Sequence, residues 1–283
     1  LESGGKRLRP LFLLSSARLA EYKGDEHIAL AGIIELIHMA SLLHDDVVDA
    51  AKIRRGRAAA HSVWGNQIVI LVGDFLYSNA LRKAVSFKDQ RIMEALSEAT
   101  TSMTEGEILQ LQKTADINIT EDEYIKIISA KTGLLISAAC RIGAILSIRP
   151  PAEENALAMF GLKAGTAFQM ADDILDYMAE ESELGKKLGK DIGEGKITLP
   201  VIYLLKNASA DEKEEIKRII EKPSEEGLRR ILALFRQYSV LEESLKRAQA
   251  LVDEAKDELS IFPDSPDRDA MLSLADYAIS RDK

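Results

Sequence analysis

Two clusters of aspartate residues are the part of the sequence best suited to chemistry. The first is the run DDVVD at positions 45–49, and the second is the run DDILD at positions 172–176. In each run the first and last aspartates are four positions apart, so on a helix they would share one face. Hard oxygen donors without cysteine or paired histidine favour Mg²⁺, which usually shares its coordination with water and substrate phosphates.

The occurrence of two such clusters is more informative than either one. A single run of carboxylates at a helix end is usually a solvated face. Here each run directly follows an apolar segment, and like charges would crowd at the negative end of the helix dipole. A sequence tolerates that arrangement where a cation binds. The pair of runs therefore predicts a magnesium-binding site.

Basic residues near the clusters could hold a phosphate group. Arginine binds phosphate oxygens in a bidentate manner and lysine acts as a point charge. The candidates are Lys52, Arg54, Arg55 and Arg57 after the first cluster, Lys186, Lys187, Lys190 and Lys196 after the second, and the segment GGKRLRP at positions 4–10. For Lys52, Arg57 and Lys187, we favour a solvent-exposed side chain over one that binds phosphate. The glycine-lysine segment lacks the spacing of a Walker loop, so we interpret it as a flexible flap over a phosphate.

The elements that must position these residues are helices. Apolar residues recur at helical spacing over 29–43, 68–76, 125–142 and 157–174, and no sustained alternation indicates strands. Helices that are apolar on most faces belong at the centre of a large bundle. Helix starts are indicated by Thr120 with Glu123, Ser209 with Glu212, Ser239 with Glu242, and Ser265 before Pro266. After about position 207 the helices become shorter and more charged, as in an outer layer. The sequence predicts one all-α domain over residues 1–283.

Bulk composition narrows the function further. The formal charge of −9 argues against a nucleic-acid partner, since such proteins are normally basic. The single cysteine, Cys140, lies in an apolar run, which predicts a buried thiol and a reducing, cytoplasmic location. No run of about 18 consecutive apolar residues occurs, so we expect no transmembrane segment.

Several ordered motifs resemble those of the trans-isoprenyl diphosphate synthases. They are GGKRLRP at 4–10, LLHDDVVD at 42–49, RRG at 54–56, KTG at 131–133, and FQ at 168–169 followed by DDILD at 172–176. The segments ELIH at 35–38, GDFLY at 73–77 and EGE at 105–107 resemble the medium- and long-chain members, such as the octaprenyl and heptaprenyl diphosphate synthases. The resemblance implies an isoprenoid synthase fold: a bundle of about ten or more helices around a central cavity. It also implies a homodimer, and the family's first helix is expected to be largely missing here.

The resemblance also implies roles for individual residues. Asp45 and Asp49 would bind two Mg²⁺ ions on an allylic diphosphate, and Asp172 would bind a third. The allylic substrate would contact Arg54, Lys131, Thr132, Gln169, Lys186 and Lys196. Isopentenyl diphosphate would contact Lys6, Arg9, His38 and Arg55. The catalytic set would be Asp45, Asp49, Arg54, Lys131, Asp172 and Lys186. Without the motif, a core histidine bonded to the backbone would be the preferred interpretation of His38.

Product length depends on the space below the first cluster. The residues one helical turn before it are Ala40 and Ser41, both small, whereas members that make short products often place an aromatic residue near here. This favours long products of about six to ten isoprene units in an apolar tunnel. The change Ala40→Tyr should shorten the product.

Four other functions compete with this one. A geranylgeranyl or farnesyl diphosphate synthase uses the same site and is the nearest alternative. A terpene cyclase usually lines its pocket with aromatic residues, and the aromatic content here is only 5%. A non-catalytic subunit tends to lose its aspartates, and all of them are present. A helical scaffold would need no buried charge clusters, and diphosphate binding with Mg²⁺ would distinguish it.

Overall fold

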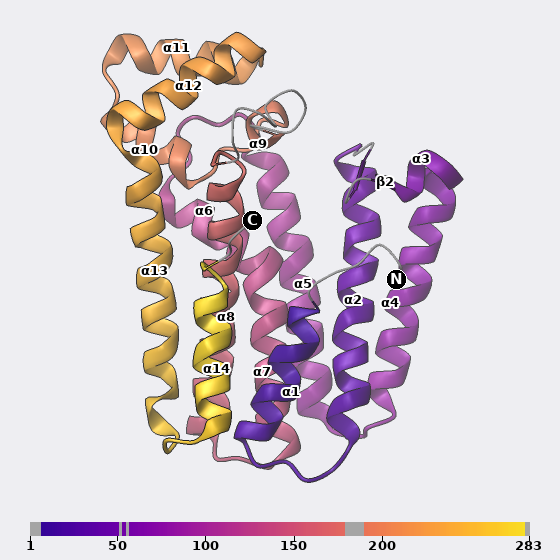
Figure 1. The fold of residues 1–283 in the computed structure, drawn as a ribbon. Coiled ribbons are helices and arrows are strands. Elements are labelled where there is room, and N and C mark those ends of the chain that lie inside the picture. The colour runs from indigo at the N-terminus through magenta and orange to yellow at the C-terminus, as the bar shows by residue number, and fades with distance from the viewer. Residues whose placement is uncertain (1–6, 51–52, 55–56, 179–189, 281–283) are drawn as a thin grey trace. The chain divides into compact units, whose positions relative to one another are not determined.

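The computed structural model describes residues 7–50, 53–54, 57–178 and 190–280, and the described chain is mainly helical (Figure 1). The elements are α1 (Leu8–Leu19), α2 (Glu26–Val48), β1 (Ile53–Arg54), β2 (Arg57–Ala58), α3 (Ala60–Trp64), α4 (Asn66–Val85), α5 (Gln90–Gln112), α6 (Glu121–Ile128), the π-helical turn η1 (Ser129–Gly133), α7 (Leu134–Leu146), α8 (Pro151–Leu175), α9 (Lys190–Gly193), α10 (Leu199–Asn207), α11 (Ala210–Glu221), α12 (Glu225–Tyr238), α13 (Val240–Glu258), the 3₁₀ turn η3 (Leu259–Ile261) and α14 (Pro266–Tyr277). The two short strands pair antiparallel, with Arg54 opposite Arg57. The predicted all-α fold class is confirmed.

The apolar segments found in the sequence form long helices, with one interruption. The predicted segments 29–43, 68–76 and 157–174 lie within α2, α4 and α8. The segment 125–142 is not one continuous α-helix, because the π-helical turn η1 separates α6 from α7. This turn contains the KTG motif at 131–133. Isolated π-helical turns inside α-helices are frequent at functional sites.

The helix caps follow the predicted signals at three of four positions. Complete capping boxes form at Thr120 with Glu123 and at Ser209 with Glu212. The hydroxyl of Ser265 accepts a hydrogen bond from the backbone N–H of Arg268 at 3.1 Å, as expected for a cap before Pro266. The fourth signal correctly marks a helix start, because α13 begins directly after Ser239, but its capping box does not form. Ser239 precedes α13, but it adopts a left-handed conformation (φ 51°) that ends α12, and its side chain makes no cap bond.

The chain divides into two compact units, each assembled from separate stretches. Unit 1 contains Leu1–Thr100, Leu135–Gly161 and Ile261–Met271, and unit 2 contains Thr101–Leu134, Leu162–Ser260 and Leu272–Lys283. The first aspartate cluster belongs to unit 1 and the second to unit 2. That the two units form a single domain stays a prediction.

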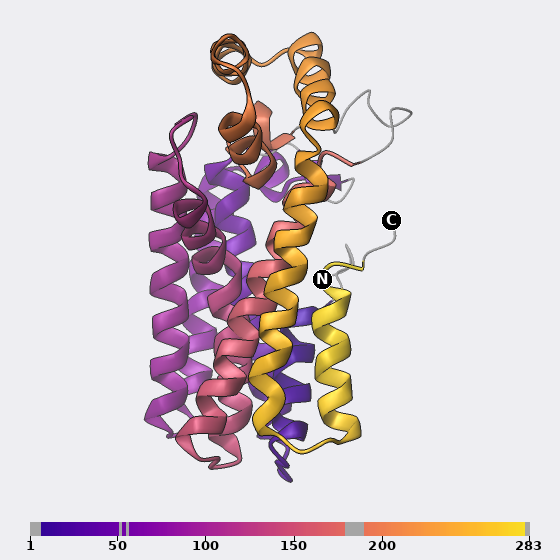
Figure 2. The ribbon, with the colours of Figure 1, turned by 90° about the vertical axis from the view of Figure 1, so that its left-hand side faces the viewer.

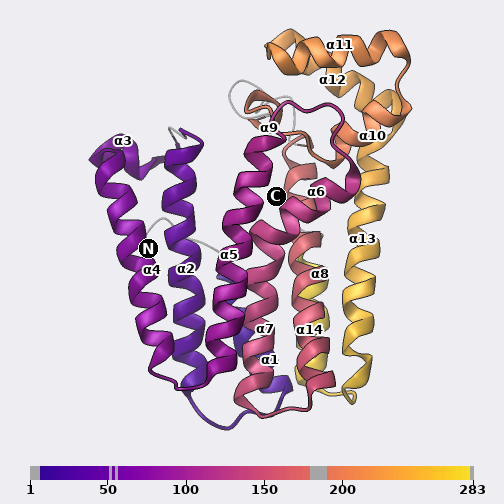
Figure 3. The same ribbon diagram turned by 180° about the vertical axis from the view of Figure 1, so that it is seen from behind.

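Unit 1 is built around α1, α2, α4 and α7. α2 and α4 lie side by side along most of their length (Figures 1 and 3). α1 approaches α7 closely because residue 143 is glycine: a Cβ there would lie only 2.1 Å from Oγ of Ser16. The rings of Phe12 and Phe160 pack with centroids 6.0 Å apart. Cys140 is fully buried, as predicted, and burial raises the pKa of its thiol, so it is an inert core residue.

Unit 2 is organised by α13, the long yellow-orange helix in Figure 2. α13 packs against α10 and α12, and its last turn is tied to α8 by an ion pair between Lys163 and Glu258 at 2.7 Å. The ring of Tyr177, which follows α8, meets that of Phe235 edge-on at 5.1 Å. The side chain of Arg247 on α13 also pairs with Glu121 at the start of α6, at 3.1 Å. These contacts fix the end of α8, where the second aspartate cluster lies.

Two stretches of the described chain are long and apolar enough to pass a length-and-composition test for a membrane span. They are α2 and the stretch Glu121–Leu146, and 67% of the apolar window of the second is buried. Core helices of globular proteins pass the same test, so neither stretch establishes a span.

Candidate active site

The first aspartate cluster lies at the C-terminal end of α2 and presents two different environments. The backbone N–H of Asp49 donates to the carbonyl of Asp45 at 2.8 Å, so the helical geometry continues through the cluster. Asp46 is only 2% exposed, whereas Asp45 and Asp49 are half-buried. One carboxylate is thus turned into the protein, and two lie one turn apart on a more accessible face.

The second cluster repeats this arrangement at the end of α8. The N–H of Asp176 donates to the carbonyl of Asp172 at 3.1 Å, and both residues are half-buried. Asp173 is 9% exposed. Its two carboxylate oxygens accept hydrogen bonds from the hydroxyl of Tyr124 at 2.7 Å and from Nε2 of Gln169 at 2.8 Å. Asp173 is therefore held inward by specific donors.

Negative charge around the second cluster is only partly compensated. Burial raises the pKa of Asp173, while its hydrogen bonds from Tyr124 and Gln169 act in the opposite direction. Burial also raises the pKa of Asp191, and the charges of Asp173 and Asp176 add to that effect against the opposing charge of Lys196. The backbone N–H of Asp191 donates to Oδ2 of Asp176 at 3.4 Å. A bound cation would relieve this crowding of carboxylates.

Residues predicted to contact the allylic substrate adjoin the second cluster in unit 2. Oγ1 of Thr132 donates to Oε1 of Gln169 at 2.9 Å, and Gln169 in turn bonds Asp173. The neighbouring Lys131 forms an ion pair with Glu107, and its Nζ donates to Oε1 of Gln110 at 2.5 Å. The structure thus brings Thr132 and Gln169 into one hydrogen-bonded chain with the second cluster.

Lys196 is held close to the same region by the backbone. Its N–H donates to the carbonyl of Asp191 at 2.7 Å, and its Nζ pairs with Glu194 at 2.7 Å. The preceding Gly195 has a positive φ of 72°, a conformation that side chains rarely adopt. The carbonyl of Gly195 accepts the N–H of Ala115, which anchors this turn to the segment after α5.

Two residues predicted to hold isopentenyl diphosphate meet in unit 1. Nη1 of Arg9, in the first turn of α1, lies 3.0 Å from Nε2 of His38 on α2. Because a guanidinium only donates, Nε2 of His38 accepts, and the neutral ring carries its proton on Nδ1. Arg7 forms an ion pair with Glu35 one turn earlier on α2. His38 is therefore bonded to a cationic side chain.

Several predicted residues cannot be placed. Lys6, Arg55 and Lys186 lie outside the described residues. Arg54 is described only through its backbone, which belongs to β1. The small residues predicted to affect chain length are both described: Ala40 is 2% exposed, and the hydroxyl of Ser41 donates to the carbonyl of His38 at 2.9 Å.

The structure also reveals contacts that sequence reasoning missed. Glu107 stands in the motif EGE at 105–107 but without a predicted role, and neither Gln110 nor Tyr124 carried a signal in the sequence. His44, for which the sequence suggested no role, packs against α4. Its Nε2 lies 3.1 Å from the carbonyl of Ile70, and a Cβ at Gly73 would lie 2.3 Å from the ring. His44 is therefore a packing residue of the α2–α4 contact.

The donor set fits a divalent cation that shares its ligands with a substrate. Within residues 7–50, 53–54, 57–178 and 190–280, no three His, Cys, Asp or Glu side chains gather closely enough to hold a metal by themselves. Each cluster instead offers two half-buried carboxylates. Mg²⁺ usually takes only one or two carboxylates and completes its shell with water and phosphate oxygens.

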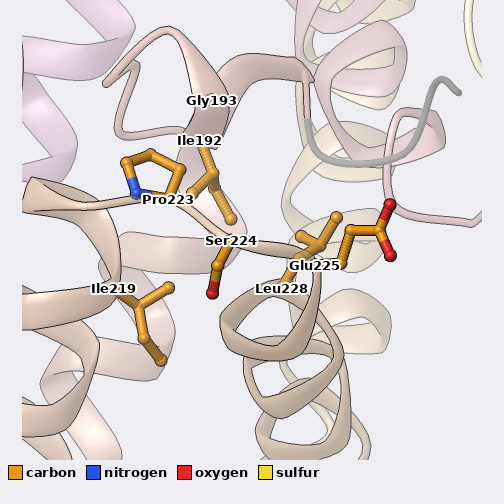
Figure 4. Close-up of a pocket in the computed structure, with 7 residues that line it drawn as sticks. All are labelled: Ile192, Gly193, Ile219, Pro223, Ser224, Glu225 and Leu228. Atoms are coloured by element: carbon orange, nitrogen blue, oxygen red, sulfur yellow. The ribbon is translucent and has the colours of Figure 1, made fainter.

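Unit 2 contains a cavity of about 220 Å³ (Figure 4). Its walls are mainly apolar, from Ile192, Ile219, Pro223 and Leu228, with Ser224 and Glu225 at one side. It contains none of the predicted site residues, and we assign it no role in the reaction.

Comparison with known proteins agrees with this arrangement. The polyprenyl synthetase family model matches residues 1–235. The chain is 39% identical over its whole length to the octaprenyl diphosphate synthase of Escherichia coli, of which it covers 88%. It is 41% identical to a polyprenyl synthase from Caulobacter crescentus whose crystal structure is complexed with calcium and isoprenyl diphosphate; the TM-score is 0.94, with 99% of this chain and 86% of that chain covered. A decaprenyl diphosphate synthase from Rhodobacter capsulatus is 40% identical with the same TM-score and coverage. The chain belongs to the polyprenyl synthetase family.

Proposed function

We propose that the chain is a Mg²⁺-dependent trans-polyprenyl diphosphate synthase. It adds isopentenyl diphosphate units head-to-tail to an allylic diphosphate, such as farnesyl diphosphate. The product is a medium- or long-chain all-trans-polyprenyl diphosphate, used for a quinone side chain. The reaction takes place in the cytoplasm.

One observation carries this proposal within the family. Each aspartate cluster ends a long helix, buries one carboxylate, and leaves two others half-exposed one turn apart. A non-catalytic member has no need for two such sets of hard oxygen donors. We assign two Mg²⁺ ions to Asp45 and Asp49 and a third to Asp172, all on the allylic diphosphate.

The remaining side chains would bind the substrates and stabilise the departing group. When bound, Mg²⁺ would neutralise charge that develops on the leaving diphosphate. The allylic diphosphate would be held by Lys131, Thr132, Gln169 and Lys196, and by Arg54 and Lys186. Isopentenyl diphosphate would be held by Arg9 and His38, together with Lys6 and Arg55.

The bond changes follow from the charges. The allylic C–O bond breaks and its electron pair leaves with the diphosphate, which the cationic side chains stabilise. The double bond of isopentenyl diphosphate attacks the resulting carbocation. A proton then leaves to the departing diphosphate, which restores a double bond and gives an allylic diphosphate five carbons longer. Apolar surroundings keep water from the carbocation.

A long product is supported by the small buried residue before the first cluster. Ala40 has a small side chain that is 2% exposed on α2, five residues before Asp45. An aromatic ring there would take up space that a growing tail needs. A geranylgeranyl or farnesyl diphosphate synthase is the remaining alternative, and it differs only in product.

A homodimer is supported by an exposed apolar stripe on α3 and α4. Trp64, Ile68, Leu71 and Phe75 follow one another at helical spacing and are 53% to 66% exposed. Contiguous apolar surface of this kind marks a protein-protein interface more often than a solvated face.

The decisive experiment is an elongation assay with purified protein, isopentenyl diphosphate, farnesyl diphosphate and Mg²⁺. The dephosphorylated products are sized by chromatography. We expect polyprenols of about six or more isoprene units, because the small residue before the first cluster leaves room for a long apolar tail. Chelation of Mg²⁺ should abolish elongation. Ala40→Tyr should give shorter products at a comparable rate of isopentenyl diphosphate use.

The assay separates the alternatives. A four-unit product would keep the reaction but reject the long-chain assignment. An unchanged product from Ala40→Tyr would remove Ala40 from the determination of length. Absence of elongation from farnesyl, geranyl and geranylgeranyl primers would reject the proposed function for this chain on its own.

A further inference from the structure

We propose that Glu107 and Gln110 are positioning residues that hold the ammonium group of Lys131 in place for the allylic diphosphate. This inference rests on the proposed function, because it concerns the leaving group of that reaction. All the residues involved lie within unit 2, on α5 and η1.

The geometry of Lys131 is defined by two acceptors from one helix. Its Nζ forms an ion pair with Oε2 of Glu107 and donates to Oε1 of Gln110 at 2.5 Å. Glu107 and Gln110 are three residues apart, so both side chains project from the same face of α5. The side chains of Lys131 and Glu107 are only 23% and 18% exposed, which limits competition from water.

The backbone is shaped to make this contact possible. Lys131 lies at the middle of the π-helical turn η1, which interrupts the helical run from Glu121 to Leu146. On the opposite side, Gly106 lets α5 approach this turn directly. A Cβ at Gly106 would lie 2.7 Å from the Cβ of Ala130 and 3.2 Å from Cγ of Lys131. Figure 3 shows the C-terminal part of α5 beside α6.

The consequence for catalysis concerns orientation. An ammonium group has three N–H donors on a long, flexible stem. Among the described residues, the side-chain partners of this ammonium group are Glu107 and Gln110. Because these two acceptors engage two of its N–H groups, they also set the direction of the third. A donor that is oriented before the reaction stabilises developing negative charge more than one that must reorganise. The carboxylate of Glu107 repels the diphosphate in the substrate and in the transition state alike, so Glu107 acts through the orientation of Lys131 and not through its own charge.

This distinction predicts unequal effects on the kinetic constants. Glu107→Ala should lower kcat of the first condensation about tenfold, because Lys131 loses its orientation. KM for farnesyl diphosphate should change less than about threefold, because removal of the repelling charge offsets the loss of a fixed donor. Glu107→Gln, which keeps one acceptor oxygen, should lie between the wild type and Glu107→Ala. KM for isopentenyl diphosphate should not change.

A control variant tests whether the effect is specific to this contact. Glu105→Gln makes the same change of charge on the same helix, and the side chain of Glu105 is exposed. Its kcat should stay within about twofold of the wild type, as expected for a surface substitution. Equal loss of kcat in Glu105→Gln and Glu107→Gln would overturn the proposal.

A second measurement is independent of turnover and isolates the pair. Gln110→Ala should weaken binding of inorganic pyrophosphate with Mg²⁺ by about fivefold in the wild-type background, and leave binding unchanged in a Lys131→Ala background. Equal weakening in both backgrounds, or none in either, would show that Gln110 does not act through Lys131. Wild-type elongation together with that result would reject this inference while leaving the proposed function intact.

Discussion

At the scale of single residues, the two aspartate clusters share one design. In each, the second aspartate is buried and the first and last are half-exposed. The buried member of the second cluster connects the cluster to Gln169 and Tyr124, so it orients α8 rather than meeting solvent. The first and last members are therefore the better candidates for metal binding, as the sequence motif predicts.

The hydrogen bond from Tyr124 gives a test of this role. Tyr124 is 3% exposed, and Tyr124→Phe would leave a buried carboxylate oxygen of Asp173 without its hydroxyl donor. Loss of a donor to a buried acceptor costs about 1–3 kcal/mol, so the free energy of unfolding in urea should fall by about that amount. The matched control is Tyr22→Phe, which removes a surface hydrogen bond to Glu26 and should change stability by less than about 0.5 kcal/mol. Equal effects of the two changes would mean that Tyr124 does not support Asp173.

At the scale of elements, the contact between α5 and the π-helical turn η1 determines where Lys131 lies. The turn adds a residue to the helical path and so alters the direction of the side chains that follow it. Gly106 permits the close approach, and Glu107 and Gln110 use it. The KTG motif therefore lies on an irregular element. A regular α-helix with the same sequence would direct the side chain of Lys131 differently.

The substitution Gly106→Ala examines this element directly. In an exposed helix interior, replacing glycine by alanine stabilises the protein by about 0.5–1 kcal/mol. Here the added Cβ would meet Ala130 and Lys131, so we expect a lower melting temperature and a lower kcat. Gly32→Ala on α2 is the control: no atom lies within 4 Å of its added Cβ, and its melting temperature should rise. A rise in both variants would show that α5 tolerates separation from η1.

At the scale of the whole molecule, the family assignment rests on nearly the full chain. The octaprenyl diphosphate synthase and the polyprenyl synthase compared above match 100% and 99% of this chain, which covers 88% and 86% of their own lengths. Six of the 46 acidic residues form the two clusters, whose carboxylates suit cations, and the basic residues that accompany the clusters suit phosphate. The molecule therefore combines an acidic surface with local sites for anionic substrates that carry metal ions.

The exposed stripe on α4 leads to a prediction about assembly. If Leu71 and Phe75 form a subunit interface, the wild type should have twice the mass of the chain in light scattering. Leu71→Glu and Phe75→Glu should shift it toward the monomer mass, because each would bury an unpaired charge in the interface. Ile148→Glu, at an isolated apolar residue that is 82% exposed, should leave the mass unchanged. A monomeric wild type would contradict the proposed homodimer.

The fold class, the two aspartate clusters and the family could all be predicted from the amino-acid sequence. These depend on local spacing: apolar residues at helical intervals indicate buried helices, and a carboxylate repeat of four positions is visible without any tertiary contact. The capping boxes at Thr120 and Ser209 were predictable for the same reason, since each involves residues three positions apart.

Which side chains meet depends on the tertiary structure. The partners of Lys131 lie on another helix, Tyr124 and Asp173 are 49 positions apart, and Arg9 reaches His38 across 29. The π-helical turn at residues 129–133, and the left-handed backbone with which Ser239 ends α12 and begins α13 without a side-chain cap bond, were likewise not predictable from the sequence. Such contacts depend on how helices pack and on the direction that packing imposes on each side chain, and neither is encoded in the spacing of residues along one helix.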